Sequence, residues 1–236
     1  MSMILSRIAN AVPFSNASRF NAYAKAVVRN APHDEAKRVE GILSFVHTKG
    51  GSDFALQIYK MLSLSQLCRE LQPKTILEIG SGASTPIFAS YAANNNASII
   101  SIEEHQEWLA TSQELVKRFG DSGAVQFQIS KTAWTMDGES PEVRYRDVPK
   151  QSYDLIFVDG PTLQNNGTDL KKTAICMDAL DFAAEGYVKH IVVDMRLPTV
   201  RALEKRLPAS WSKGISDVLT RNPREHFDYY SVFSKQ

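Results

Sequence analysis

The sequence has few cysteines, little net charge and no long apolar run. The two cysteines among its 236 residues, Cys68 and Cys176, exclude a disulfide framework and indicate a reducing compartment. The formal net charge of +1 provides no general attraction to nucleic acid or to a membrane surface. No apolar run approaches the roughly 18 residues that a membrane-spanning helix needs. These absences predict a cytoplasmic globular protein with no nucleic-acid partner and no stable membrane insertion.

The segment before Asp34 has basic residues but no acidic ones: Arg7, Arg19, Lys25 and Arg29. Its composition is similar to that of an organelle transit peptide or of a helix on a membrane surface. A helical extension packed on the domain, with its basic face in solvent, has the same composition, and we favour that interpretation. We therefore expect a helical N-terminal extension over residues 1–51 and one domain over residues 52–236.

From residue 75 onward, short apolar β-branched runs alternate with amphipathic runs. The pattern predicts strands at 75–79, 97–103, 125–129, 153–159 and 188–194. Strands that alternate with helices form a parallel sheet with right-handed crossovers. Two last strands, 215–220 and 227–233, are joined by a short turn and must be antiparallel. The predicted class is α/β: a doubly wound, mostly parallel seven-stranded sheet with an antiparallel C-terminal strand pair and the helical N-terminal extension.

Helical periodicity marks the segments between these strands and before the first. The expected helices are an amphipathic one through 39–46, one from Ser52 or Asp53 to just before Pro73, and further ones at 86–94, 105–119, 170–184 and 198–207. Residues 131–151 contain Gly138, Pro141 and Pro149, so we expect a loop with some helix there.

Residues 75–86, Thr-Ile-Leu-Glu-Ile-Gly-Ser-Gly-Ala-Ser-Thr-Pro, lead from a buried strand through a glycine turn into a helix. Gly80 and Gly82 permit a tight turn and the approach of a ligand to the backbone where a Cβ would collide. Pro86 suits the first helical turn, with Ser84 or Thr85 as its N-cap. The free N–H groups at such a helix start would hold an anionic group at the carboxyl end of the strand.

Ligands of an open α/β sheet bind at the carboxyl ends of its strands. The polar residues at these ends are Gly80 to Ser84, Glu103, Ser130 with Lys131, Asp159 and Asp194. Glu103 follows Gly80 by about twenty residues, where a carboxylate can accept hydrogen bonds from a ribose diol. It could instead be a solvated helix-start residue like Glu104, but motif and spacing together favour the ribose. His190 lies at the amino end of its strand, so we expect a structural role.

The sequence resembles the class I S-adenosylmethionine-dependent methyltransferases over about residues 52–234. Three segments carry the resemblance: Leu-Glu-Ile-Gly-Ser-Gly-Ala-Ser at 77–84, Ser-Ile-Glu at 101–103 with Trp108 after it, and Tyr-Asp-Leu-Ile-Phe-Val-Asp-Gly-Pro at 153–161. The resemblance implies S-adenosylmethionine as cofactor. Its implied ligands are Glu78 with Gly80, Ser81, Gly82, Ala83 and Ser84 at the methionine end, Glu103 and Glu104 at the ribose, Ser130, Lys131 and Thr132 around adenine, and Asp159 at the methyl group.

Two departures accompany the resemblance: Ser84 stands at the third glycine position, and Lys131 replaces an acid often found after the third strand. Gly50 and Gly51, with Lys49, are weaker candidates for contact with the methionine moiety. The sulfonium activates its own methyl group, so the protein mainly aligns an acceptor with it.

Asp159 and Asp194 are the candidate catalytic residues on the acceptor side. Asp194 could equally cap the helix that follows it. Related catechol-type enzymes hold a divalent cation with acids at these two strand ends and an adjacent Asn. Met195 follows Asp194 here, so the third ligand is missing, and we assign no metal.

The acceptor is predicted from weaker signals. Asp-Gly-Pro-Thr at 159–162 differs from the Asn/Asp-Pro-Pro-Tyr motif of enzymes that methylate amino groups. The polar loop at 160–169 suits a hydroxylated small molecule or sugar, methylated on a hydroxyl or carboxylate oxygen. Arg196 and Arg201 could bind an anionic part of it, or could be solvated surface residues. The oligomeric state is not predicted.

Two other functions fit parts of the pattern. A nicotinamide-dependent oxidoreductase would have glycine where this chain has Thr85, whose side chain would obstruct close helix–strand packing. A non-catalytic domain that retains the fold is the third possibility, against which the glycine loop and Glu103 argue.

Overall fold

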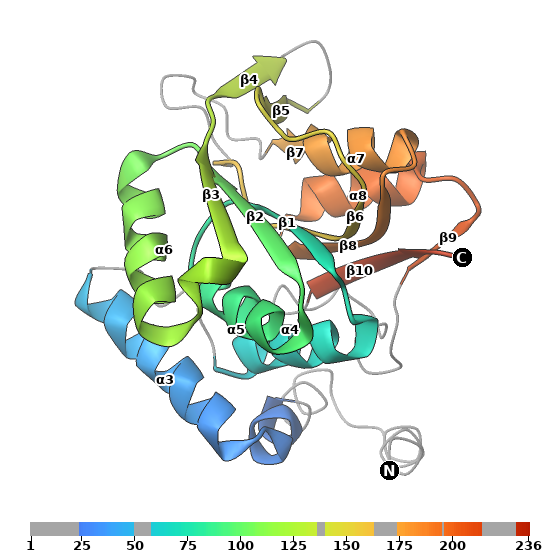
Figure 1. Ribbon diagram of the computed structural model, residues 1–236. Coiled ribbons are helices and arrows are strands. Elements are labelled where there is room, and N and C mark those ends of the chain that lie inside the picture. The colour runs from blue at the N-terminus through green and yellow to red at the C-terminus, as the bar shows by residue number, and fades with distance from the viewer. Residues whose placement is uncertain (1–23, 50–57, 136–139, 163–173, 195, 214–229) are drawn as a thin grey trace, which may run out of the picture.

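The computed structural model describes residues 24–49, 58–135, 140–162, 174–194, 196–213 and 230–236. A central sheet of seven strands has the order β3-β2-β1-β6-β8-β10-β9 (Figure 1). Its strands are β1 (Thr75–Ile79), β2 (Ser98–Glu103), β3 (Val125–Ile129), β6 (Tyr153–Val158), β8 (Val188–Asp194), β9 (Trp211–Lys213) and β10 (Tyr230–Lys235). The first five in this spatial order are parallel, and β10 is antiparallel to both β8 and β9. This confirms the α/β class, with a mostly parallel sheet and an antiparallel pair at the C-terminus.

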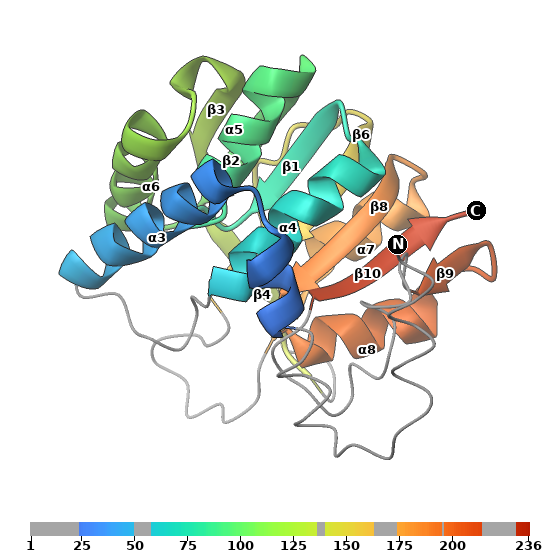
Figure 2. The same cartoon turned by 90° about the horizontal axis from the view of Figure 1, so that it is seen from below.

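Helices cover both faces of the sheet. On one face lie α3 (His33–Thr48), α4 (Ile58–Leu71), α5 (Thr85–Asn95) and α6 (Gln106–Phe119), and on the other α7 (Met177–Ala184) and α8 (Leu197–Arg206) (Figures 1 and 2). Two separate hydrophobic clusters fill the two layers. The first includes Val39 and Ile42 of α3, both fully buried. The division of the chain at residues 51 and 52 remains a prediction.

The segment 131–151 differs from its prediction. It contains β4 (Thr132–Thr135) and β5 (Glu142–Tyr145), which pair antiparallel, and β7 (Ile175–Cys176) extends them to a small second sheet. In β5, Val143 and Tyr145 are buried while Glu142 and Arg144 are half-buried, the alternation of a strand. These strands are too short for their pattern to stand out among Gly138, Pro141 and Pro149. The helix expected at 170–184 begins only at Met177, because β7 precedes it.

The C-terminal strand pair also differs in its bounds. The strand that pairs with β10 is β9, at Trp211–Lys213, which precedes the segment 215–220 where a strand was predicted. Residues 215–220 and the turn around Asn222-Pro223 lie outside the described residues. So do residues 52–57, where the helix before Pro73 was expected to start.

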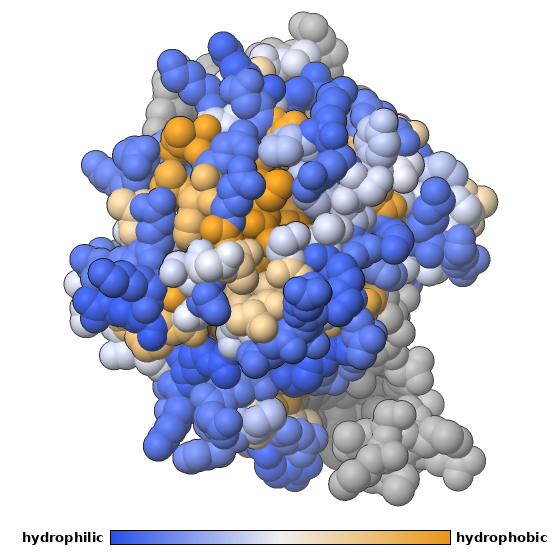
Figure 3. Space-filling view, viewed as in Figure 1, coloured by the Kyte–Doolittle hydropathy of each residue, from blue (hydrophilic) through white to orange (hydrophobic). Residues whose placement is uncertain are grey.

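The surface near β3 combines hydrophilic and apolar side chains. Figure 3 shows apolar residues near the centre of this face with hydrophilic residues around them. Ile129, at the end of β3, is 47% exposed.

Within the described residues, no helix has the length and apolar character needed to cross a membrane.

Candidate functional site

The predicted site residues gather near the carboxyl end of β1, where the strand order of the sheet reverses. β1 lies between β2 and β6, so the strands that follow β1 are added first on one side of it and later on the other. The turn after β1 is tied to both neighbours: the Gly80 amide donates to the Ile102 carbonyl at 2.8 Å, and the Asp159 amide donates to the Ile79 carbonyl at 2.8 Å. Such a switch point is the position of ligand sites in open α/β sheets.

The backbone conformation and the close packing at residue 80 require a glycine. Its φ is +92°, and a Cβ placed on it would lie 2.5 Å from the amide nitrogen of Gly160. The turns after β1 and β6 therefore touch each other directly at these two glycines. Gly82 is different, because a Cβ there would meet no atom within 4 Å. The absence of a side chain at Gly80 is therefore explained by its contact with Gly160, and the approach of a ligand to Gly80 and Gly82 stays a prediction.

Glu78 holds the glycine turn from below. It is fully buried, and its carboxylate accepts hydrogen bonds from the hydroxyls of Ser84, Thr85 (2.7 Å) and Ser101. Burial raises its pKa to about 7, against the lowering effect of these hydroxyls. Ser84 is the N-cap residue of α5, as predicted, but its hydroxyl bonds to Glu78 and caps no helical amide. Glu78 thus orders the loop 80–85 through side chains.

Glu103 lies at the carboxyl end of β2 and faces the same loop. Its carboxylate accepts hydrogen bonds from the amides of Ser81 at 3.1 Å, Glu104 at 2.8 Å and His105 at 2.9 Å. Burial raises the pKa of Glu103, and Glu104 adds to this, while the three amides oppose it. The structure therefore brings the glycine loop and the acid of the neighbouring strand into direct contact.

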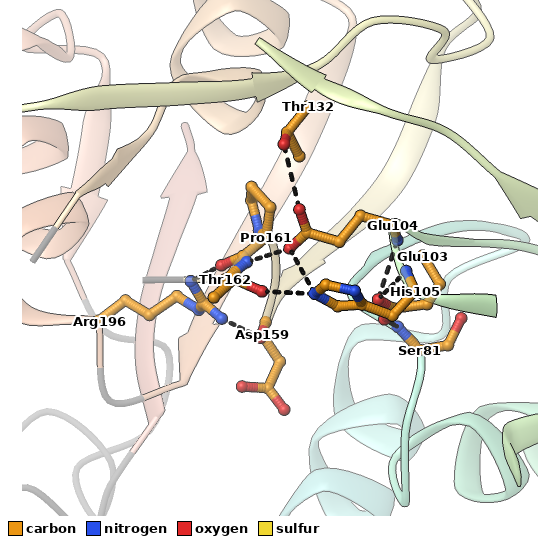
Figure 4. A network of polar contacts seen from close by, with 9 residues as sticks. All are labelled: Ser81, Glu103, Glu104, His105, Thr132, Asp159, Pro161, Thr162 and Arg196. Carbon is orange, nitrogen blue, oxygen red and sulfur yellow. Dashed lines mark hydrogen bonds and ion pairs between the residues drawn. The ribbon is translucent and has the colours of Figure 1, made fainter. Parts of the chain in front are cut away.

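A second polar network connects Glu104 with two other segments (Figure 4). Glu104 accepts from the amide of Thr162 and, at 3.1 Å, from the hydroxyl of Thr132 on β4. The ring of His105 lies 3.1 Å from the Thr162 hydroxyl. Glu104 thus bridges the ends of β2, β4 and the turn after β6, a role that nothing in its sequence position indicates. Together with Glu103, Glu104 and His105 bring their ligand atoms within 4.8 Å, but their hydrogen bonds account for this arrangement.

The residues predicted around adenine differ in their burial and in their hydrogen bonds. The buried hydroxyl of Ser130 accepts from the amide of Asp147 at 3.0 Å, and Thr132 bonds to Glu104. Lys131 between them is exposed. Tyr145 of β5 has a buried hydroxyl with no hydrogen-bond partner within the described part of the chain. Burial, with repulsion from Glu103 and Glu104, raises the pKa of this hydroxyl, which was not predicted to be part of the site.

A small pocket opens beside the glycine loop and contains both predicted catalytic acids. Its lining residues come from α4, the loop after β1, β6, β8 and β10: Met61, Leu64, Ala83, Ser84, Phe157, Asp159, Asp194 and Tyr230. The Asp159 residue is exposed, and its carboxylate points away from the Glu104 network (Figure 4). Surrounding protein atoms and the charge of Asp194 raise its pKa, opposed by Arg196 and Lys60, and solvent screens part of this effect.

Asp194 forms an ion pair with a lysine for which no role was predicted from the sequence. It is buried at the end of β8 and forms an ion pair with Lys60 of α4. Burial raises the pKa of Asp194 while Lys60 and Arg196 lower it. Gly50, Gly51 and residues 163–169 of the polar loop lie outside the described residues. Lys49 pairs with Glu114 of α6 at 3.2 Å.

Arg196 is a buried residue that braces the turn after β6. Its guanidinium donates to the carbonyl oxygens of Asp159 and Pro161. Arg201, in contrast, is exposed on α8. The alternative that both arginines are solvated surface residues is therefore wrong for Arg196.

We expect Arg196→Met to destabilise the protein by about 1–3 kcal/mol, because two carbonyl oxygens in the turn 159–162 lose a charged donor. Chemical denaturation measures the change. Arg201→Met is the matched control, expected to shift the free energy of unfolding by less than about 0.5 kcal/mol. Equal effects of the two substitutions would contradict the bracing role.

Comparison with solved structures identifies the class of fold. An S-adenosylhomocysteine-bound methyltransferase of Podospora anserina, PaMTH1, has a TM-score of 0.57 at 16% identity, covering 96% of this chain and 99% of that one. The O-methyltransferase TomG of Streptomyces achromogenes, involved in tomaymycin synthesis and solved with S-adenosylmethionine, has a TM-score of 0.60 at 15% identity, covering 94% and 100%. An O-methyltransferase of Bacillus cereus in complex with S-adenosylhomocysteine has a TM-score of 0.55 at 11% identity, covering 85% and 91%.

These similarities define the fold as that of the class I S-adenosylmethionine-dependent methyltransferases, as the resemblance in sequence implied. No protein-family model and no curated protein matches the chain.

Proposed function

We propose that this protein is an S-adenosylmethionine-dependent methyltransferase that acts on an oxygen atom of a small molecule or sugar. The observation that carries the proposal is the direct contact between the glycine loop and Glu103, through the Ser81 amide. This contact places the loop after β1 and the acid at the end of β2 side by side. We infer that the amino-acid tail of the cofactor lies at the loop and its ribose at Glu103.

The surroundings of the glycine loop and Glu103 support the proposed binding of the cofactor. The open space beside Gly82 leaves room above the loop, and the unpartnered Tyr145 hydroxyl lies near the carboxylates of Glu103 and Glu104. When bound, the sulfonium supplies an activated methyl group. In this assignment Glu103 holds the ribose, the loop 80–84 holds the methionine end, and Ser130, Lys131 and Thr132 flank the adenine.

The pocket beside the loop is the proposed position of the acceptor. Asp159 and Asp194 provide its polar side, while Met61, Leu64 and Phe157 provide an apolar wall. A mixed pocket of this kind suits an acceptor with a carbon skeleton and an oxygen nucleophile. Asp159 orients the acceptor oxygen at the methyl group, and the turn braced by Arg196 fixes the position of Asp159.

We expect Glu103→Ala to weaken the binding of S-adenosylhomocysteine by about 1–3 kcal/mol, because the ribose hydrogen bonds are lost. Isothermal titration calorimetry measures the dissociation constant. Glu103 also accepts hydrogen bonds from three backbone amides, so Glu103→Gln is the control, because it preserves the size of the side chain and some of these bonds. Circular dichroism checks that each variant is folded.

Titration of the unmodified protein with S-adenosylmethionine, S-adenosylhomocysteine and NAD(H) tests the whole proposal. Binding of the adenosyl ligands alone supports it. Binding of NAD(H) alone would favour an oxidoreductase, and binding of none at millimolar concentration would favour a non-catalytic domain. An unchanged dissociation constant in Glu103→Ala would remove Glu103 from the site.

A further inference from the structure

Lys60 is a buried lysine next to the proposed acceptor pocket. It is the third residue of α4 and only 4% exposed, the most deeply placed lysine of the described residues. Its ammonium forms an ion pair with Asp194 and lies 5.4 Å from the centre of the Tyr230 ring. β10 pairs Tyr230 with Asp194, so the ring and the carboxylate come from adjacent strands. A buried ammonium is costly unless it is paired, and this one is held from two sides.

This arrangement does not fit a divalent cation between the ends of β6 and β8. The resemblance implied such a cation in related enzymes, with two acids and an Asn as ligands. Here Asp194 already contacts an ammonium, and Met195 follows it in sequence. The guanidinium of Arg196 reaches the carbonyl oxygen of Asp159. Within the described residues, the three acid or histidine ligands that gather closely are at the end of β2 instead.

The charges near the pocket give the same result. In their ionised forms Asp159 and Asp194 provide two negative charges, which Lys60 and Arg196 match with two positive ones. The group of four is therefore balanced without a metal. A divalent cation would add two positive charges that these residues leave uncompensated, next to a sulfonium that is itself positive, and charges of one sign repel.

We propose that the ammonium of Lys60 takes the place of a divalent cation at the acceptor side of this pocket, so that the protein needs no metal. The inference rests on the proposed methyltransferase function only for its consequence in the reaction. Lys60 is a positioning residue: it neutralises Asp194 and fixes its carboxylate, so that an acceptor oxygen can lie beside Asp194 without charge repulsion. The acceptor class is then an oxygen nucleophile that needs no metal chelation, in contrast to a catechol.

Manganese binding tests this inference without an acceptor. Electron paramagnetic resonance of free Mn²⁺ measures binding to the full-length protein. We expect no tight site between Asp159 and Asp194 in the wild type. Lys60→Met removes the ammonium and leaves two carboxylates, which suffice for a hydrated divalent cation, so Mn²⁺ affinity should rise about tenfold or more. Lys60→Arg retains the charge and should show no gain.

The double variant Lys60→Met with Asp194→Asn is the second control. It avoids an unpaired buried carboxylate, so we expect it to fold, and its Mn²⁺ affinity should not exceed that of the wild type. Asp194 dependence also separates this site from weak binding at Glu103 and Glu104. Calorimetry with S-adenosylhomocysteine, with and without EDTA, should give the same dissociation constant for the wild type.

Two results would overturn the inference: tight Mn²⁺ binding by the wild type that Asp194→Asn abolishes, or a folded Lys60→Met variant with no gain in Mn²⁺ affinity. Failure of S-adenosylhomocysteine to bind would instead count against the proposed function. The Mn²⁺ comparison would still decide whether Lys60 excludes a cation.

Discussion

Gly80→Ala is expected to destabilise the protein by about 3–5 kcal/mol, a large effect for one methyl group. The new Cβ would lie 2.5 Å from the amide nitrogen of Gly160 and 2.6 Å from its Cα, and neither backbone atom can rotate away. The φ of +92° adds strain for any residue with a side chain. Urea denaturation followed by circular dichroism measures the change. If the variant unfolds fully, the amount of soluble protein and its spectrum give the answer.

Gly82→Ala is the matched control in the same loop. A Cβ there meets nothing within 4 Å, so we expect a change in stability of less than about 1 kcal/mol. Under the proposed function, the methyl group would occupy space next to the cofactor, so binding of S-adenosylhomocysteine should weaken while the fold remains. Gly160→Ala approaches the same contact from the other turn and should resemble Gly80→Ala. A stable Gly80→Ala protein would contradict the close contact of the two turns.

The main elements of the fold could be predicted from periodicity because each is long and its pattern is local. Strands β1 and β6 are runs of mostly apolar residues, and their burial on both faces explains the runs. β4, β5 and β7 have two to four residues each, and their pairing depends on segments that are distant in sequence. A pattern of that length carries no clear period, so 131–151 resembled a loop.

The site shows the same division. The glycine loop and Glu103 were found because their spacing follows a known geometric requirement of the β1–β2 unit. Glu104 was assigned to the ribose, Arg196 to an anionic part of the acceptor or to the surface, and Lys60 to no role. Their observed contacts were not predicted, because the partners lie 134, 37 and 58 residues away in sequence for the Lys60–Asp194, Arg196–Asp159 and Glu104–Thr162 pairs. One signal was available for Lys60: a lysine among the apolar residues of a helix that leads directly into the first strand.

The free energy of unfolding is expected to fall as the pH rises from about 4.5 to about 7, and Glu78 to be one cause. The pKa of buried Glu78 is raised from 4.5 to about 7. Within that window the native protein holds a proton that the unfolded chain releases, so rising pH favours unfolding. The resulting decrease in the free energy of unfolding is on the order of 2–3 kcal/mol at pH 7 and vanishes below about pH 4.5. Denaturant titrations at a series of pH values measure it.

Glu78→Gln should remove this part of the pH dependence, because an amide cannot ionise but can still exchange hydrogen bonds with the hydroxyls of Ser84, Thr85 and Ser101. Asp178, whose pKa burial also raises to about 7, gives a parallel slope that remains in this variant and that Asp178→Asn would remove separately. Glu78→Ala should instead lose about 2–4 kcal/mol at every pH, since it leaves a cavity and three buried hydroxyls without their acceptor. If Glu78→Gln kept the full slope of the wild type between pH 4.5 and 7, Glu78 would have to be ionised throughout this range, and its carboxylate would hold the loop as an anion.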